Sequence, residues 1–260
     1  MRIAVNGGDT FVATGGRDFD ANLPAIVFLH GAGLDHTVWA LLARAFAHHG
    51  HAVLAPDFPG HGRSAGAPLA SIAALADWTV ALIEAAGAKA ARIVGHSMGS
   101  LVALETAARH PAKVTGLDLI ATTASMRVSD DLLAAAKADD HAAIDMIAIW
   151  GEGYQATLGG SQAPGMWMLG GAERLLERAR PGAIFADLSA CNAYADALSA
   201  AGKVKVPSLV IQGSRDLMTP AKGGKALAAA IPNCRLALIE GAGHMLMTER
   251  PDEVLAALRN

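Results

Sequence analysis

The sequence predicts an α/β fold, in which a mostly parallel, twisted sheet carries helices on both faces and a helical insertion. Short apolar runs typical of buried strands alternate with amphipathic helical patterns before residue 122 and again after residue 204. Between these stretches the strand-like runs disappear and helical patterns remain. We therefore expect a core made of residues 1–122 and 204–260, with a helical cap at residues 123–203.

The first part of the chain is expected to contain a hairpin, followed by buried strands that alternate with helices. Asn6-Gly7-Gly8-Asp9 is a turn sequence of the kind that joins antiparallel strands. Ser71 is placed to cap a helix, because its hydroxyl can accept a free N–H of the first turn. The expected elements are Arg2–Val5 and Thr10–Thr14 (strands), Ala25–Leu29 (strand), Thr37–Ala47 (helix), Ala52–Ala55 (strand), Ile72–Ala86 (helix) and Val114–Ile120 (strand).

The block from about Thr123 to Lys203 is expected to form several helices. Because ligands bind beyond the carboxyl ends of the strands in open α/β sheets, we expect this block to lie there. Helix breaks are expected at Gly151, Gly159-Gly160, Pro164-Gly165, Gly170-Gly171 and Pro181-Gly182. The alternation then resumes with a strand at Ser208–Gln212, a helix near Thr219–Ile231, a strand at Arg235–Ile239 and a last helix from Pro251.

Composition excludes several classes of function. The chain has 260 residues, a formal net charge of −3 and no basic stripe, so we expect no nucleic-acid partner. No signal peptide is visible, and no apolar run is long enough to span a bilayer. Cys191 and Cys234 lie far apart without metal-type spacing, which favours reduced, structural thiols and a cytoplasmic protein.

The stretch from Ala91 to Leu104 carries the strongest chemical signal. An apolar run leads into the G-x-S-x-G motif GHSMG, and apolar residues at helical spacing follow it. A strand, a sharp turn and a helix in this order form a nucleophile elbow, with Ser97 at its apex. Gly95 and Gly99 are expected because the strand and the helix pass too close there for a β-carbon. We therefore expect Ser97 to be a nucleophile.

Two residues beyond later strands are expected to complete the catalytic group. A serine hydroxyl needs a base within hydrogen-bond reach, and that base needs an acid partner. Asp216 follows a strand through Gly-Ser-Arg, and His244 follows the next strand through a small-residue, flexible segment. Asp216 has the alternative role of starting the next helix. Asp118, inside a strand, and Asp57, before the elbow, are weaker candidates for the acid.

A developing oxyanion needs two backbone N–H donors. One is expected from Met98, directly after the nucleophile, where a helix begins. The other is expected from Ala32, because the loop HGAG after Ala25–Leu29 offers exposed backbone at the right place. We expect His30 to support this loop and not to transfer protons.

Five motifs, in this order, resemble the α/β-hydrolase fold superfamily: HGAG, DFPGHGRS, GHSMG, GSRD and GAGH. The resemblance covers nearly the whole chain, with residues 123–203 matching the variable helical cap. It implies a serine hydrolase that acts through an acyl-enzyme without a metal or an organic cofactor. Ser97 would attack, His244 would transfer the proton and Asp216 would orient His244. The sequence departs from many relatives at Ser100, where they have a second glycine.

The cap segment is rich in methionine and aromatic residues, which suit an adaptable apolar pocket. They are Met126, Met146, Trp150, Met166, Trp167, Met168, Phe185 and Tyr194. Trp150 and Trp167 are expected to line the pocket, followed by Phe58 and Met245 beside neighbouring loops. The cap has no basic cluster, which disfavours a highly anionic substrate such as a CoA thioester. A small or medium carboxylic ester is the expected substrate.

Three alternatives remain open on the sequence. Hydrolases of carbon–carbon bonds share this architecture but often have asparagine at the position of His96, which counts against them. Acyltransferases share the same catalytic group and differ in the acceptor. A non-catalytic ligand receptor is disfavoured by the complete set of catalytic residue types.

Overall fold

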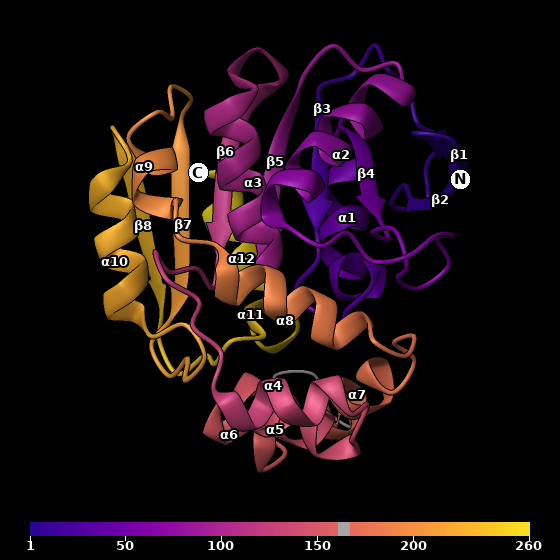
Figure 1. Ribbon diagram of the computed structural model, residues 1–260. Helices are drawn as coiled ribbons and strands as arrows, with labels where there is room; N and C mark the ends of the chain where they lie inside the picture. The colour runs from indigo at the N-terminus through magenta and orange to yellow at the C-terminus, as the bar shows by residue number, and fades with distance from the viewer. Residues whose placement is uncertain (161–166) are drawn as a thin grey trace.

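The computed structural model describes residues 1–160 and 167–260 and contains an eight-stranded sheet (Figure 1). The strand order is β1-β2-β4-β3-β5-β6-β7-β8, with β3 to β8 parallel and β1 and β2 antiparallel. The strands are β1 (Arg2–Val5), β2 (Gly8–Ala13), β3 (Ala25–Leu29), β4 (Ala52–Pro56), β5 (Ala91–His96), β6 (Val114–Ile120), β7 (Ser208–Gly213) and β8 (Cys234–Ile239). The expected mostly parallel sheet is therefore confirmed.

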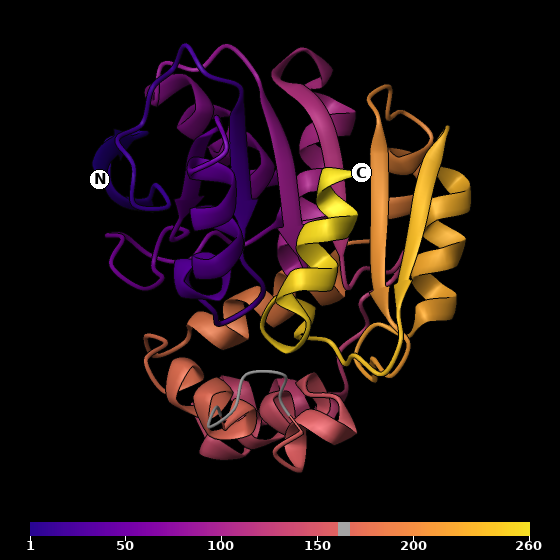
Figure 2. The same ribbon diagram turned by 180° about the vertical axis from the view of Figure 1, so that it is seen from behind.

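Helices cover both faces of the sheet (Figures 1 and 2). One face packs on α2 (Ile72–Ala85), α3 (Met98–Arg109), α9 (Ala197–Ala201) and α10 (Ala221–Ala230). The other face packs on α1 (Ala40–Ala47) and α12 (Pro251–Arg259). Two apolar clusters result, one on each face, because strands such as β3 are buried on both sides. None of the helices in the described residues is both long and apolar enough to cross a membrane.

Local capping explains where several helices begin. The Ser71 hydroxyl accepts the Ala74 N–H at 3.2 Å, which confirms the expected start of α2. Asp35 caps a 3-10 turn, η1 (His36–Trp39), which precedes α1. The expected helix Thr37–Ala47 is therefore divided into this turn and α1. A short helix, α11 (Leu246–Glu249), was not expected; it begins two residues after His244, with Leu246 buried.

Between β6 and β7 the described residues form several helices and no strand, as expected. They are α4 (Asp130–Lys137), α5 (His141–Gly151), α6 (Tyr154–Thr157), α7 (Met168–Leu176), α8 (Ala183–Ala193) and α9. Figures 1 and 2 show α4 to α7 grouped beyond one end of the sheet, with α8 between that group and the strands. In contrast, α9 packs beside the sheet against α3 and α10.

The expected helix breaks differ in outcome. α5 ends at Gly151, and Gly182 precedes α8 with a φ of 77°. The break expected at Gly170-Gly171 is wrong, because α7 runs through both residues. The Trp167 ring packs so closely on Gly170 that a β-carbon would collide with it, which explains this glycine inside a helix. Pro164-Gly165 and Met166 lie outside the described residues.

Candidate active site

Ser97 lies on a strained turn between β5 and α3. Its φ of 52° and ψ of −119° are unusual for a residue with a side chain, and strain of this kind persists where the surrounding structure imposes it. The Ser97 N–H donates to the Ile120 carbonyl at 3.0 Å. A β-carbon on Gly95 would meet the Gly99 carbonyl, and one on Gly99 would meet the Leu29 carbonyl. The steric reason expected for both glycines is confirmed.

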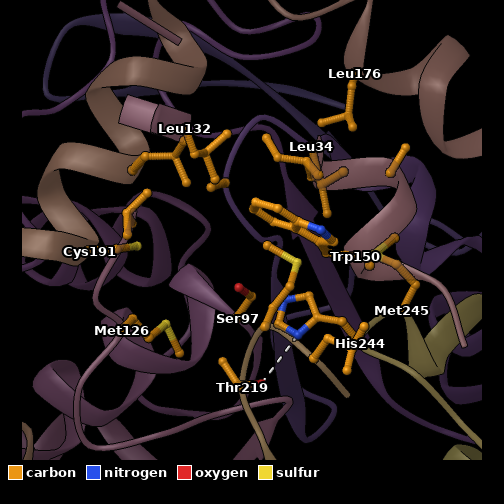
Figure 3. Close-up of a pocket in the computed structure, with 18 of the residues that line it drawn as sticks. Leu34, Ser97, Met126, Leu132, Trp150, Leu176, Cys191, Thr219, His244 and Met245 are labelled. Atoms are coloured by element: carbon orange, nitrogen blue, oxygen red, sulfur yellow. Dashed lines mark hydrogen bonds between the residues drawn. The ribbon is translucent and has the colours of Figure 1, made fainter. Parts of the chain in front are cut away.

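Asp216 and His244 meet beyond the ends of the neighbouring strands β7 and β8. The His244 Nδ1–H donates to Asp216 Oδ2 at 2.9 Å, and both side chains are buried. Asp216 Oδ1 also accepts the Met218 and Thr219 N–H groups, each at 2.8 Å. These two N–H groups belong to the turn before α10, whose N-cap is Pro220 without a side-chain cap bond, so Asp216 shapes that turn and does not cap the helix. Because parallel strands end at one edge, the loop after β8 also brings His244 to the same place as Ser97 (Figure 3).

The pKa of Asp216 is lowered. Burial alone would raise it, but the charge of His244 and the hydrogen bonds from His244 and Thr219 outweigh burial. The carboxylate is thus ionised at neutral pH and available to stabilise a positive charge on His244.

Thr219 is a member of this group that the sequence analysis did not select. Its Oγ1 donates to Asp216 Oδ2 at 2.6 Å and lies 3.2 Å from His244 Nδ1, the contact drawn in Figure 3. Thr219 is 3% exposed and lines the same cavity as Ser97. In the sequence, Thr219 precedes a proline at the start of a helix, which gives no sign of this contact.

The two backbone donors expected for an oxyanion come from two different segments of the chain. The Met98 N–H starts α3, and Ala32 belongs to the loop after β3 and lines the cavity. Neither N–H donates a hydrogen bond to any residue in 1–160 or 167–260. A helix start also concentrates positive potential, which suits a negatively charged oxygen.

His30 supports this loop, as expected. Its Nδ1–H donates to the Gly31 carbonyl at 2.9 Å, and its Nε2 accepts the Phe58 N–H at 3.1 Å. Burial, and then the nearby charge of His61, lower the pKa of His30 to about 4. The ring is therefore neutral at neutral pH, with both nitrogens used in structural hydrogen bonds.

A buried carboxylate from α8 stabilises the same loop, and the sequence analysis did not select it. Asp187 Oδ2 accepts the Gly33 N–H at 2.9 Å and the His61 Nε2–H at 2.8 Å. Burial alone would lower the pKa of His61, but the charge and hydrogen bond of Asp187 outweigh it and raise that pKa. This contact connects the loops after β3 and β4 to a helix of the insertion.

Ser97 and His244 open into an apolar cavity of about 240 Å³. Of the residues expected to bind substrate, Trp150 and Met245 line it (Figure 3). Cys191, expected to be a structural thiol, is buried and also lines this cavity. The other apolar lining residues labelled in Figure 3 are Leu34, Met126, Leu132 and Leu176.

Phe58 and Trp167 do not line this cavity. Phe58 is fully buried, and its ring lies 4.6 Å from that of His30 and 5.5 Å from that of Trp78, measured between centroids. Trp167 is 66% exposed and lines a second cavity of about 340 Å³, which also contains Glu152. The two cavities share Ala172 and Met245 as lining residues.

His96 lies beside His244 without being a second base. Its Nε2–H donates to the His244 carbonyl at 3.0 Å, and the two rings are 4.8 Å apart. Burial, followed by the charge of His244, lowers the pKa of His96 to about 3. The ring is therefore neutral and contributes to the position of the histidine loop.

Among the described residues, Asp35, His36 and Asp57 are the group whose side chains could hold a metal ion. Their ligand atoms lie within 4.8 Å of one another. The carboxylates already accept local donors: Asp57 accepts His36 Nδ1–H at 2.7 Å, and Asp35 accepts the Thr37 N–H at 2.9 Å. These contacts shape the loop after β3.

Comparisons with known proteins agree with this architecture. The family model for the alpha/beta hydrolase fold matches residues 24–251. A pimeloyl-(acyl-carrier protein) methyl ester esterase from Chromobacterium violaceum is 32% identical over 246 residues, covering 90% of this chain and 92% of the relative. The crystal structure of the enol-lactonase from Burkholderia xenovorans LB400 superposes with a TM-score of 0.87 at 26% identity, covering 100% and 98% of the two chains. A thermophilic esterase gives a TM-score of 0.81 at 29% identity, covering 100% and 95%. The chain is thus an esterase-like member of the α/β-hydrolase fold family.

Proposed function

We propose that this chain is a carboxylesterase that cleaves a small or medium carboxylic ester through an acyl-enzyme. Ser97 is the nucleophile, His244 the general base and Asp216 the acid that orients His244. The observation that carries the proposal is the arrangement at one cavity floor: a serine on a strained turn beside a histidine bonded to a buried aspartate. A serine hydroxyl activated in this way attacks acyl carbons.

The proposed reaction has two halves. The Ser97 oxygen attacks the ester carbonyl carbon while its proton passes to His244 Nε2, the ring nitrogen not bonded to Asp216. His244 then protonates the leaving alcohol, and a water molecule, deprotonated by His244, releases the acid and restores Ser97. The Ala32 and Met98 N–H groups stabilise the oxyanion in both halves. None of the described residues is hydrogen-bonded to the Ser97 hydroxyl, and we expect its bond to His244 Nε2 to form when substrate binds.

The cavity supports an apolar acyl or alcohol group of modest size. Its volume of about 240 Å³ and its leucine, methionine and tryptophan lining suit uncharged carbon chains. The named relative acts on a methyl ester and the named structural neighbour on an enol-lactone, and both substrates contain an ester bond. We also propose that residues 123–203 act as the cap, with α4 to α8 over the cavity and α9 on the core.

Ester turnover tests this proposal. We expect wild type to hydrolyse p-nitrophenyl acetate and butyrate, and Ser97→Ala to lose this activity while remaining folded. A panel of methyl esters and lactones of increasing chain length then defines the substrate class. Equal rates for wild type and Ser97→Ala would remove Ser97 as the nucleophile.

A further inference from the structure

Two buried carboxyl groups lie behind the histidine loop, and the proposed reaction uses neither of them. Glu152 follows α5 and is 4% exposed, whereas Glu249 ends α11 and is 5% exposed. Glu249 accepts the Gly243 N–H on both of its oxygens, each at 3.0 Å. It also accepts the Gly153 N–H at 3.2 Å. One carboxylate therefore joins two segments that are far apart in the chain.

These two segments are the base-carrying loop and the end of a cavity-lining helix. Gly243 directly precedes His244, and Gly153 lies two residues beyond the end of α5. The His244 and Met245 N–H groups also donate to the Gly151 carbonyl, at 2.9 and 3.0 Å. The loop that carries His244 is thus connected to α5 directly and through Glu249.

Close approach of the two backbones makes this bridge possible. A β-carbon on Gly153 would lie 2.7 Å from Glu249 Oε2 and 3.0 Å from the Gly243 nitrogen. A β-carbon on Gly243 would lie 2.8 Å from Glu249 Oε1 and would collide with the Gly153 nitrogen. Glycine at both positions lets one carboxylate reach both N–H groups.

The charge state of the pair follows from these contacts. Burial, and then the charge of Glu249, raise the pKa of Glu152 to about 8, and Glu152 Oε2 has no partner among the described residues. Burial also raises the pKa of Glu249, but the Gly243 and Gly153 N–H groups and Arg250 favour its ionised form. Glu249 is therefore the charged member and Glu152 the neutral one.

We propose that Glu249 is a positioning residue for the reaction: by bonding to Gly243 and Gly153, it fixes the loop of His244 against the end of α5. This inference rests on the proposed role of His244. Displacing a catalytic group by about 1 Å lowers the rate on the order of a hundredfold, so losing a contact next to the base should lower kcat strongly.

The test compares Glu249→Gln with the matched control Glu152→Gln. Both changes replace a buried carboxyl group by an amide of the same size, but only Glu249 bonds to the histidine loop. For Glu249→Gln we expect kcat to fall by about tenfold or more with KM changed by less than about threefold, because the base is displaced and the cavity is kept. Glu152→Gln should leave kcat within about twofold of wild type.

Amide hydrogen exchange provides a readout that does not depend on activity. We expect Glu249→Gln to speed exchange at Gly243 and Gly153, and Glu152→Gln to leave it unchanged. If Glu249→Gln does not fold, Glu249→Asp is the alternative variant. Its carboxylate lies one carbon closer to its own backbone, so we expect the same changes in kcat and in amide exchange, but smaller ones.

Wild-type kcat in folded Glu249→Gln, or equal losses in both variants, would overturn the positioning role. A different outcome is also informative: amide exchange changes as expected, although the wild-type protein hydrolyses no ester. That result would reject the proposed function and support the contacts of Glu249 with Gly243 and Gly153.

Discussion

The carboxylate of Asp216 accepts four hydrogen bonds, which determine what it can do for His244. Two come from backbone N–H groups, one from the Thr219 hydroxyl and one from His244. These donors lower its pKa, so the interaction stabilises the folded protein above the usual aspartate pKa and is lost as pH falls through the lowered value. The acid partner therefore stays ionised throughout the neutral range.

Thr219→Val should weaken this arrangement without removing it. A hydrogen bond to a charged group contributes about 1.5–3 kcal/mol, so we expect kcat/KM to fall by about tenfold or more. The loss of a donor also raises the pKa of Asp216, so the carboxylate stays ionised over a narrower range of pH. Profiles of kcat/KM from about pH 4 to 8 provide the measurement. Thr219→Ser should restore the wild-type curve, and an unchanged curve in Thr219→Val would show that the hydroxyl is not needed.

His244→Ala should lose on the order of a thousandfold or more in kcat, because a disabled triad retains only binding and oxyanion effects. Residues that act as one unit are not additive. The double variant with Ser97→Ala should therefore be no slower than the slower single variant. A loss below about tenfold in His244→Ala would mean that another group is the base.

At the scale of elements, the segment from β8 to α11 is fixed by its neighbours and not by its own sequence. The glycine-rich lead to His244 suggests a flexible connection. In the structure, Gly243 donates to Glu249, and a β-carbon on Gly213 would collide with the Gly243 and Ala242 carbonyls. The small residues before His244 allow close packing of the backbone and do not make this segment flexible.

Glu152 should make the stability of the protein depend on pH. Its pKa is raised from 4.5 to about 8, so the folded state keeps a proton that the unfolded state releases above pH 4.5. The free energy of unfolding should fall as pH rises through this window, by on the order of a few kcal/mol, and level off above it. The charge of Glu249 contributes to this shift, and Arg174 and Arg178 line the same cavity as Glu152.

Urea unfolding of wild type and Glu152→Gln from about pH 5 to 9 isolates this contribution. The amide introduced by this substitution does not titrate. As pH rises, the free energy of unfolding should therefore fall more for wild type than for Glu152→Gln. Parallel curves across the whole range would contradict the buried, neutral state of Glu152.

Met245 lines both the cavity at Ser97 and the second cavity, so we expect its side chain to act as a wall between them that limits chain length. We expect Met245→Ala to connect the two spaces and accept longer acyl chains. Each added CH₂ that becomes buried contributes about 0.8 kcal/mol, so two of them change the preference about tenfold. Met126→Ala is the matched control, because Met126 is equally buried but lines the first cavity alone. The measurement is kcat/KM for a series of esters of increasing chain length. If the chain-length preference changes equally in Met245→Ala and Met126→Ala, Met245 does not limit chain length.

At the scale of the whole molecule, the parallel sheet explains why residues distant in sequence meet. The strands β5, β6, β7 and β8 lie side by side in that order, so the loops after β5, β7 and β8 reach one edge. Helices from the insertion lie beyond this edge and line the cavity with Trp150 and Leu176 (Figure 1). The location of the cavity is thus a consequence of the topology.

The sequence predicted the fold because local patterns determine it: apolar runs, a capping Ser71 and the glycines of the elbow. It also selected Ser97, Asp216 and His244, because chain order and strand ends limit the choices. Contacts between residues far apart in the sequence leave no local pattern that would predict them. The bridge from Gly153 to Glu249 spans 96 positions, and Asp187 meets His61 across 126.

Side-chain direction likewise depends on contacts that local sequence patterns do not determine. Phe58 stands beside a loop near the site, but its ring points into the core between His30 and Trp78. Trp167 belongs to the insertion, but it lines the second cavity and packs on Gly170. Which way an aromatic residue points depends on packing partners that become known only from the folded chain.

Labelling with a fluorophosphonate tests the central claim most directly, because this reagent forms a covalent bond with an activated serine. We expect peptide mass spectrometry to find the adduct on Ser97 in wild type, a much slower reaction in His244→Ala and none in Ser97→Ala. An adduct on another residue, or equal labelling rates in wild type and His244→Ala, would contradict the proposed role of Ser97 and His244.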